Sequence, residues 1–297
     1  MILPVLVTEH YISSLLVDDA DPSGDIKIKG NAFFQIPFQE DPLKPKVDFS
    51  RIERLVKEKL GKESEELEPM FITEPVDQLV ENIPLPVIFL DHFNFSNHTN
   101  WEESDINTYH NNLNYAQPIP KDLKGPIDAD IVKTYVKKHV GSLIGMHHVL
   151  LVTPGTCGID HKTYVKKLIG DFANSVNIAG IWDFTLDDQI GLIPFSVILK
   201  SKGLDLGEYF KEHPLKSDAK LVIAPGVEDV LYSREEKNKD ADFKTEKLKK
   251  DSITTISIKA DEKVNIKWKN QKSKYDGQMY GSELGIIIAN NERRSGD

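Results

Sequence analysis

The clearest pattern along the chain is a repeated arrangement of apolar and charged positions near its middle. Residues 133–141 read KTYVKKHVG and residues 162–170 read KTYVKKLIG, so the second segment nearly copies the first. In each copy the apolar positions recur at spacings of three and four residues, the period of one helix face. They are Val132, Tyr135, Val136, His139, Val140 and Leu143, and then His161, Tyr164, Val165, Leu168, Ile169 and Phe172. The pattern predicts two amphipathic helices from one supersecondary unit used twice.

A short apolar stretch follows each predicted helix, at 147–153 and at 178–184. Similar stretches occur at 87–91 and 220–224, and short continuous apolar runs are typical of buried strands. Helices that alternate with strands at this spacing favour parallel strands joined by right-handed crossovers. We therefore expect an α/β fold with a mainly parallel sheet, flanked by helices that come partly from the duplicated helix-strand unit.

The first 50 residues predict an irregular, β-containing segment, with turn signals and several prolines between short apolar runs. Apolar residues at helical spacing then predict a helix over 51–60, with a cap in the segment Asp48-Phe49-Ser50 and a glycine stop at Gly61. Residues 190–201 fit either a helix or an apolar strand, because glycine, proline and β-branched residues compete there.

The C-terminal part begins with a charged stretch, 233–251, which is typical of a linker or an exposed helix. Residues 252–260 and 264–269 then alternate with period two and predict a hairpin, and 284–289 predicts one more strand. The predicted domains are an α/β domain over 1–232, the charged linker over 233–251 and an antiparallel β-hairpin module over 252–297.

The composition of the chain limits where the protein is expected in the cell and which partners it is expected to bind. The 297 residues include one cysteine, and the start of the chain lacks the features of a secretory signal, so we expect a cytoplasmic protein, or one assembled into a particle made in the cytoplasm. No apolar stretch approaches the roughly 20 residues that span a bilayer, so we expect no membrane partner. A net charge of −10 makes nucleic acid an unlikely partner unless a local basic face outweighs the whole-molecule field.

Three aspartates follow or end the predicted strand at 178–184: Asp183, Asp187 and Asp188. The carboxyl ends of strands are where α/β sheets gather catalytic groups, so these carboxylates are candidate acid–base or metal-binding groups. Aspartates at strand ends also serve as helix caps and turn formers. Both interpretations stay open at this point.

A second candidate lies in the glycine-containing loop at 153–160, which joins a predicted strand to a predicted helix. Cys157 could be a nucleophile whose pKa the following helix lowers, with His161 as its base. A single cysteine in such a turn more commonly packs as a small buried residue.

A third candidate is a metal site. Asp91, His92, His98 and His110 crowd one polar stretch, and carboxylate with imidazole suits a divalent metal such as zinc. Their spacing matches no compact ligand motif, and the same residues fit a polar loop above the end of a strand. No other cofactor is predicted.

The duplicated segment also carries six lysines on the sides of the helices that are polar. They are Lys133, Lys137, Lys138, Lys162, Lys166 and Lys167. Such a stripe could bind an acidic partner or a phosphate-bearing ligand, although exposed lysines ordinarily only keep a helix face solvated.

Two function classes follow from these observations. The first is a non-enzymatic structural or interaction protein, a subunit of a homo- or hetero-oligomeric assembly such as a virion or phage particle, in which strand edges join neighbouring chains. The alternative is an intracellular metal-dependent hydrolase that uses the aspartates and histidines at strand ends. We favour the first, because no acid, base or ligand set is recognisable as a motif.

Overall fold

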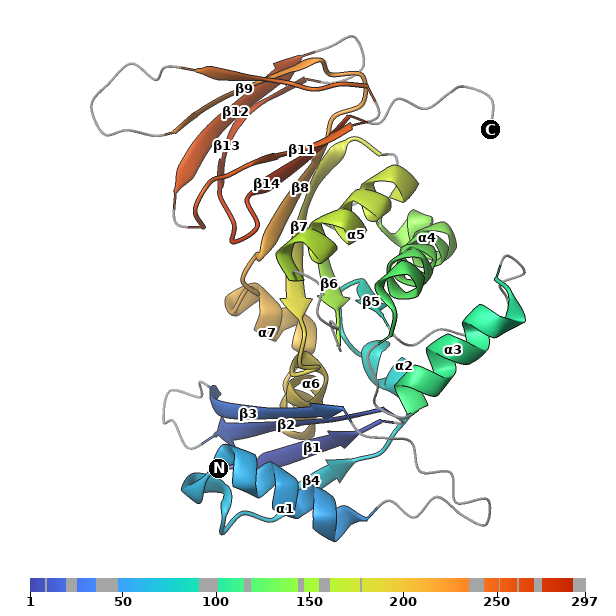
Figure 1. Ribbon diagram of the computed structural model, residues 1–297. Helices are drawn as coiled ribbons and strands as arrows, with labels where there is room; N and C mark the ends of the chain where they lie inside the picture. The colour runs from blue at the N-terminus through green and yellow to red at the C-terminus, as the bar shows by residue number, and fades with distance from the viewer. Residues whose placement is uncertain are drawn as a thin grey trace. The chain divides into compact units, whose positions relative to one another are not determined.

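The structure is a computed structural model of the chain. It describes residues 1–8, 10–19, 26–35, 48–90, 101–114, 119–143, 147–154, 161–176, 178–234, 243–250, 252–260, 262–269 and 274–290. The chain divides into two compact units, drawn in Figure 1. Unit 1 comprises Met1–Lys124, Val152–Gly158 and Asp187–Pro214; unit 2 comprises Gly125–Leu151, Ile159–Leu186 and Leu215–Asp297.

Unit 1 is built on a four-stranded sheet of order β3-β2-β1-β4. Its strands are β1 (Leu3–Val7), β2 (Tyr11–Asp18), β3 (Lys27–Gln35) and β4 (Pro69–Ile72). β1 pairs antiparallel with β2 and parallel with β4, while β2 pairs antiparallel with β3. The N-terminal segment is therefore β-structured, as its sequence predicts.

Helices cover both faces of this sheet. Successive side chains of a strand point to opposite faces, and both sets of side chains include apolar residues. On one face Leu3, Val5 and Ile12 pack with Ile52 and Val56 of α1 (Phe49–Leu60). On the other face Leu15 and Val17 pack with α6 (Leu192–Ser201) through Phe195, Ile198 and Leu199. The segment 190–201, which sequence left open between helix and strand, is thus largely a helix.

The caps of α1 follow the sequence prediction. The Asp48 side chain accepts the Arg51 backbone N–H at 3.0 Å, and Gly61 ends the helix with φ of 80°. The remaining elements of unit 1 are the 3₁₀ turn η1 (Lys62–Ser64), α2 (Val76–Val80), β5 (Val87–Phe89), α3 (Glu103–Asn114) and α7 (Leu206–Glu212).

Unit 2 contains a mixed sheet whose strands run in the order β11-β14-β8-β7-β6. They are β6 (His148–Val152), β7 (Gly180–Asp187), β8 (Ala219–Ile223), β11 (Ser252–Ile256) and β14 (Ile286–Asn290). Hydrogen bonds from Asp183 N to His147 O and from Thr153 N to Asp187 O show that β6 and β7 run parallel.

The prediction of a mainly parallel sheet needs correction. β7 pairs antiparallel with β8, and β14 pairs parallel with β8 but antiparallel with β11. Two helices, α6 and α7, separate β7 from β8 in sequence, and this longer connection permits either direction. The fold class is therefore mixed α/β with a mixed sheet.

A separate antiparallel sheet in unit 2 has the order β10-β9-β12-β13. Its strands are β9 (Asp229–Arg234), β10 (Lys244–Lys247), β12 (Lys263–Lys269) and β13 (Lys274–Tyr280). The predicted hairpin of 252–260 with 264–269 is wrong, because β11 pairs with β14 while β12 pairs with β13 and β9. Alternation identifies a half-buried strand but not its partner.

The two sheets of unit 2 share one core. Val222, Ile286 and Ile288 of the mixed sheet pack with Val264 and Trp268 of the antiparallel sheet. The domain boundaries predicted at 232 and 252 stay a prediction.

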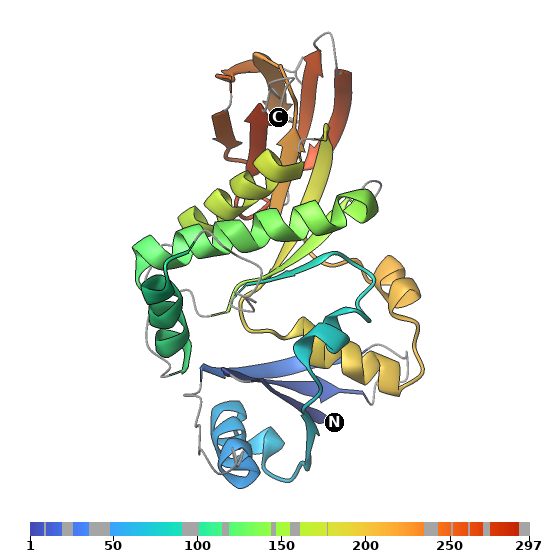
Figure 2. The ribbon, with the colours of Figure 1, turned by 90° about the vertical axis from the view of Figure 1, so that its right-hand side faces the viewer.

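Both copies of the duplicated segment are helical. They lie in α4 (Lys121–Leu143) and α5 (His161–Val176), and β6 and β7 are the next strands after them. The two helices lie side by side in unit 2 (Figure 1, Figure 2). The apolar face of α5, including Val165, Leu168 and Ile169, is buried as the spacing predicts. That the two helix-strand segments are one unit used twice stays a prediction.

Candidate functional site

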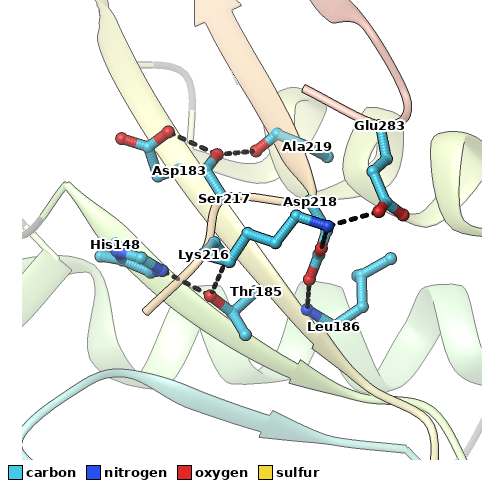
Figure 3. A network of polar contacts seen from close by, with 9 residues as sticks. All are labelled: His148, Asp183, Thr185, Leu186, Lys216, Ser217, Asp218, Ala219 and Glu283. Carbon is cyan, nitrogen blue, oxygen red and sulfur yellow. Dashed lines mark hydrogen bonds and ion pairs between the residues drawn. The ribbon is translucent and has the colours of Figure 1, made fainter. Parts of the chain in front are cut away.

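The main candidate site is a polar network on one face of the mixed sheet, built from β7 outward. Successive side chains of a strand point to opposite faces. Trp182 and Phe184 pack edge-on against Phe172 of α5, with ring centroids 6.2 Å and 5.1 Å away. Asp183 and Thr185 therefore lie on the face opposite α5 (Figure 3).

Two side chains bind Asp183: Ser217, just before β8, and Lys220, within β8. Oδ1 of Asp183 accepts the Ser217 hydroxyl at 2.6 Å and forms an ion pair with Lys220, which lies opposite Asp183 in the register of β7 and β8. The Lys220 side chain is only 13% exposed. A nearly buried cation needs such a partner, because an unpaired charge away from water is strongly destabilising.

Thr185 joins β6 to the same segment. Its hydroxyl donates to Lys216 O at 2.7 Å, and Nε2 of His148 lies 2.7 Å from the Thr185 oxygen. Because the hydroxyl proton is already directed to a carbonyl, His148 must donate from Nε2, which identifies the tautomer. Burial lowers the pKa of His148, and the nearby Asp183 only partly opposes this.

Asp218 extends the network beyond the last residue pair of β7 and β8. Its carboxylate accepts the Leu186 backbone N–H at 2.9 Å, and its own N–H donates to Phe184 O at 2.8 Å. Lys216 forms an ion pair with Glu283, and this contact lowers the pKa of Glu283 (Figure 3). The segment before β8 is thereby attached to β7 on one side and to the loop before β14 on the other.

The geometry of the network indicates what it can do chemically. A serine nucleophile requires a base that takes its proton, and that base must be oriented by a third group. Here the Ser217 proton is directed to Asp183, while His148 donates to Thr185. These contacts hold three strands together and form no relay that would activate Ser217.

Asp187 belongs to unit 1 and binds the first residues of α6. Its two carboxylate oxygens accept the backbone N–H groups of Gly191 and Leu192, each at 2.8 Å, at the start of α6. Burial raises its pKa, although these hydrogen bonds partly offset the effect. Its neighbour Asp188 is exposed. Asp183 belongs to unit 2, so the predicted trio of carboxylates is divided between the two units.

The turn after Asp187 is strained. Ile190 is fully buried and has φ of 55°, a region that β-branched residues rarely adopt. The Ser13 hydroxyl, from β2, donates to Gln189 O at 2.7 Å. Together with the Asp187 cap, this hydrogen bond holds the turn in a conformation that would otherwise be unfavourable.

Several predicted site residues lie outside the described residues: Cys157, Asp91, His92 and His98. The backbone of His110 belongs to α3, but its side chain also lies outside the described part of the structure. His161 is the first residue of α5 and is half-buried. Within the described part of the chain, no three or more histidine, cysteine, aspartate or glutamate side chains gather in a way that could hold a metal ion. The metal-dependent hydrolase, the zinc site and the Cys157–His161 pair stay predictions.

Two of the six predicted interaction lysines belong to the contact between α4 and α5. Burial raises the pKa of Asp171 on α5, and Lys133 of α4 and Lys167 of α5 oppose that rise, so both cations lie near this carboxylate. Lys167 Nζ is also 3.6 Å from where a Cβ at Gly125 of α4 would stand.

The other four lysines, Lys137, Lys138, Lys162 and Lys166, are exposed or half-buried on the same helices. A role for any of the six in binding a partner stays a prediction.

Sequence reasoning missed most of the network. The alternation of Trp182 and Phe184 with Asp183 and Thr185 is a detectable signal, because it places two polar side chains on one face of a buried strand. Their partners carry no such signal. They are Ser217, Asp218, Lys220, His148 and Glu283, which come from distant parts of the chain.

Comparisons with protein-family models, with curated protein sequences and with solved structures give no match to this chain. Among the helices that the structure describes, none is both long enough and apolar enough to cross a bilayer.

The network makes a pH-dependent prediction. We expect the free energy of unfolding to fall as the pH drops below about 6.5, the ordinary histidine pKa, because unfolded His148 takes up a proton that the folded site disfavours. His148→Gln removes this proton uptake and should flatten the profile in that range. The measurement is denaturant unfolding at a series of pH values. A variant profile as steep as that of the wild type would contradict a half-buried imidazole that stays neutral in the fold.

Proposed function

We propose that the protein is a non-enzymatic structural or interaction protein that joins a larger assembly through the edge strand β11. The observation that supports this proposal most directly is the composition of that strand. Its five residues read SITTI and include no charge and no proline. Within the described part of the chain, β11 has one neighbouring strand, β14.

An edge strand of this kind is a template for pairing with another chain, because its outer N–H and C=O groups lack a strand partner. Proteins that stay monomeric usually protect such edges with charges, prolines or bulges. Ile253, in the middle of β11, is 40% exposed. An exposed β-branched residue beside an unprotected edge favours addition of a strand from a partner.

The edges of the two four-stranded sheets are protected. In the antiparallel sheet, β10 reads KTEK and β13 reads KYDGQMY, each with charges of both signs. In unit 1, β3 carries Lys27 and Lys29, and β4 begins at Pro69. The contrast with these four edges supports β11 as the place where a neighbouring chain pairs.

The state of the candidate catalytic carboxylates supports the same class of function. Asp183 is paired with Lys220 and Ser217, and Asp187 caps α6. Both carboxylates therefore have contacts that stabilise the fold, which is the expected use of aspartate in a structural protein.

The test is a charge placed on the edge of β11. We expect the wild type to elute as a species heavier than one chain, and Ile253→Lys to shift it toward the monomer, because a lysine would be trapped beside the added strand. Size-exclusion chromatography with light scattering over a range of concentrations measures this shift. Thr254→Lys, on the same strand, should act in the same direction.

The matched control is Ile28→Lys on the protected edge β3, where Ile28 is 50% exposed. It makes the same chemical change and should leave the mass distribution as in the wild type. Thermal unfolding of each variant checks that the fold is intact. A wild type that is monomeric at every concentration would contradict the proposal.

A further inference from the structure

The antiparallel sheet of unit 2 has an inner face that belongs to the core and an outer face that does not. Val230, Val264, Ile266, Trp268 and Met279 point into the core shared with the mixed sheet. Because neighbours along a strand alternate between faces, the residues between them form the outer sheet face. Its charged and aromatic members are Lys247, Asp229, Lys263, Lys267, Lys269, Lys274, Asp276 and Tyr280, all exposed or half-buried.

The outer sheet face is basic although the chain as a whole carries a net charge of −10. Among its described residues, lysines outnumber aspartates, and Asp276 pairs with Lys267 at 3.5 Å. Lys247, Lys269 and Lys274 have no ion-pair partner among the described residues. A concentration of positive charge in an acidic protein indicates an anionic ligand at that surface.

Two of these lysines lie directly opposite each other. Lys269 of β12 faces Lys274 of β13 in the strand register. Like charges in this position are destabilising. Trp268 and Tyr275, the next pair along, are stacked with ring centroids 4.5 Å apart, so the backbone is fixed here and both lysines leave the sheet from neighbouring positions. A bound phosphate between the two ammonium groups would relieve the repulsion.

Aromatic rings lie among the lysines. Tyr280 is 53% exposed, with Lys263 Nζ 5.3 Å from its ring centroid. Phe243, which precedes β10, is 39% exposed, with Lys267 Nζ 4.8 Å from its ring centroid. Exposed rings that alternate with cations on a sheet are the arrangement by which proteins stack bases and contact phosphates of single strands.

We propose that the outer sheet face binds single-stranded nucleic acid, with the lysines on phosphates and Tyr280 and Phe243 stacked on bases. The net charge of the chain argued against nucleic acid only in the absence of a local basic face, and this sheet is such a face. An acidic protein would fit less well, because Leu231 is the one exposed aliphatic side chain among the described residues of these strands. A stable protein interface needs an apolar centre.

The first test measures the salt dependence of binding. The full chain is titrated into fluorescent single-stranded RNA and DNA of mixed sequence, and anisotropy is recorded at several salt concentrations. We expect Lys269→Ala/Lys274→Ala to weaken binding and to reduce the slope of log K against log salt by about 1.4, or about 0.7 for each lost phosphate contact. Lys59→Ala/Lys62→Ala, at two exposed lysines of unit 1, makes the same charge change and should leave the slope unaltered.

The second test separates stacking from charge. Tyr280→Ala should weaken binding by about 5- to 150-fold at constant salt, because one stacked base contributes roughly 1 to 3 kcal/mol. Polyglutamate is the competing polyanion. Absence of binding at low salt, an unchanged slope in the Lys269/Lys274 variant, or displacement by polyglutamate as effective as by unlabelled RNA would each overturn the assignment. Thermal unfolding of each variant excludes a simple loss of fold.

Discussion

Asp187→Ala is expected to lower the free energy of unfolding by about 2 to 4 kcal/mol. The substitution leaves the backbone N–H groups of Gly191 and Leu192 without their carboxylate acceptors, at a position where Asp187 itself is only 8% exposed. Each donor left unsatisfied away from water costs about 1 to 3 kcal/mol. Relief of the desolvation that raises the Asp187 pKa offsets part of this loss.

The effect should spread through α6, which packs on the sheet of unit 1 through Phe195, Ile198 and Leu199. Asp188→Ala is the matched control, because this exposed neighbour carries the same chemical group. It should change the free energy of unfolding by less than about 0.5 kcal/mol. Equal effects at the two positions, measured by chemical denaturation, would contradict the assignment of Asp187 as the cap of α6.

The helices of the repeat and the ends of α1 could be predicted from sequence because their determinants are local. The spacing of apolar residues decides which side of α5 is buried, and Asp48 and Gly61 lie within one turn of the helix ends that they define. Short apolar stretches also located β6, β7 and β8 correctly to within a few residues.

The order and direction of strands could not be predicted, because they depend on contacts between distant segments. β14 inserts between β8 and β11 although long stretches of chain separate it from both. The apolar pattern of Ile286 to Ala289 is the same whether its neighbours are parallel or antiparallel. The wrong hairpin prediction at 252–269 has the same origin.

The candidate site shows a similar division. Aspartates at a strand end were detectable, but their use was not, since a catalytic carboxylate and a cap have the same sequence signature. The difference lies in what surrounds each one. Lys220 and Ser217 bind Asp183, whereas Asp187 accepts two backbone N–H groups. These partners become visible only when the chain is folded.

Gly285→Ala tests the junction between β14 and the edge strand β11. Gly285 precedes β14 with φ of 81°, and a Cβ there would stand 2.6 Å from the backbone oxygen of Ile256, the last residue of β11. The left-handed conformation costs a non-glycine residue about 1 to 2 kcal/mol. Displacing the β11 backbone adds about 1 to 3 kcal/mol. We expect a total loss of about 2 to 5 kcal/mol in the free energy of unfolding.

Gly203→Ala separates these two contributions. Gly203 has φ of 74°, but no described atom lies within 4 Å of the place that a Cβ would occupy, so its substitution should cost only the conformational part. The excess cost at Gly285 then measures how tightly β11 is held against the start of β14. If chemical denaturation gives equal losses for the two variants, β11 is not in close contact there. The edge that we propose for assembly would then be poorly ordered, and strand addition at β11 would lose its structural basis.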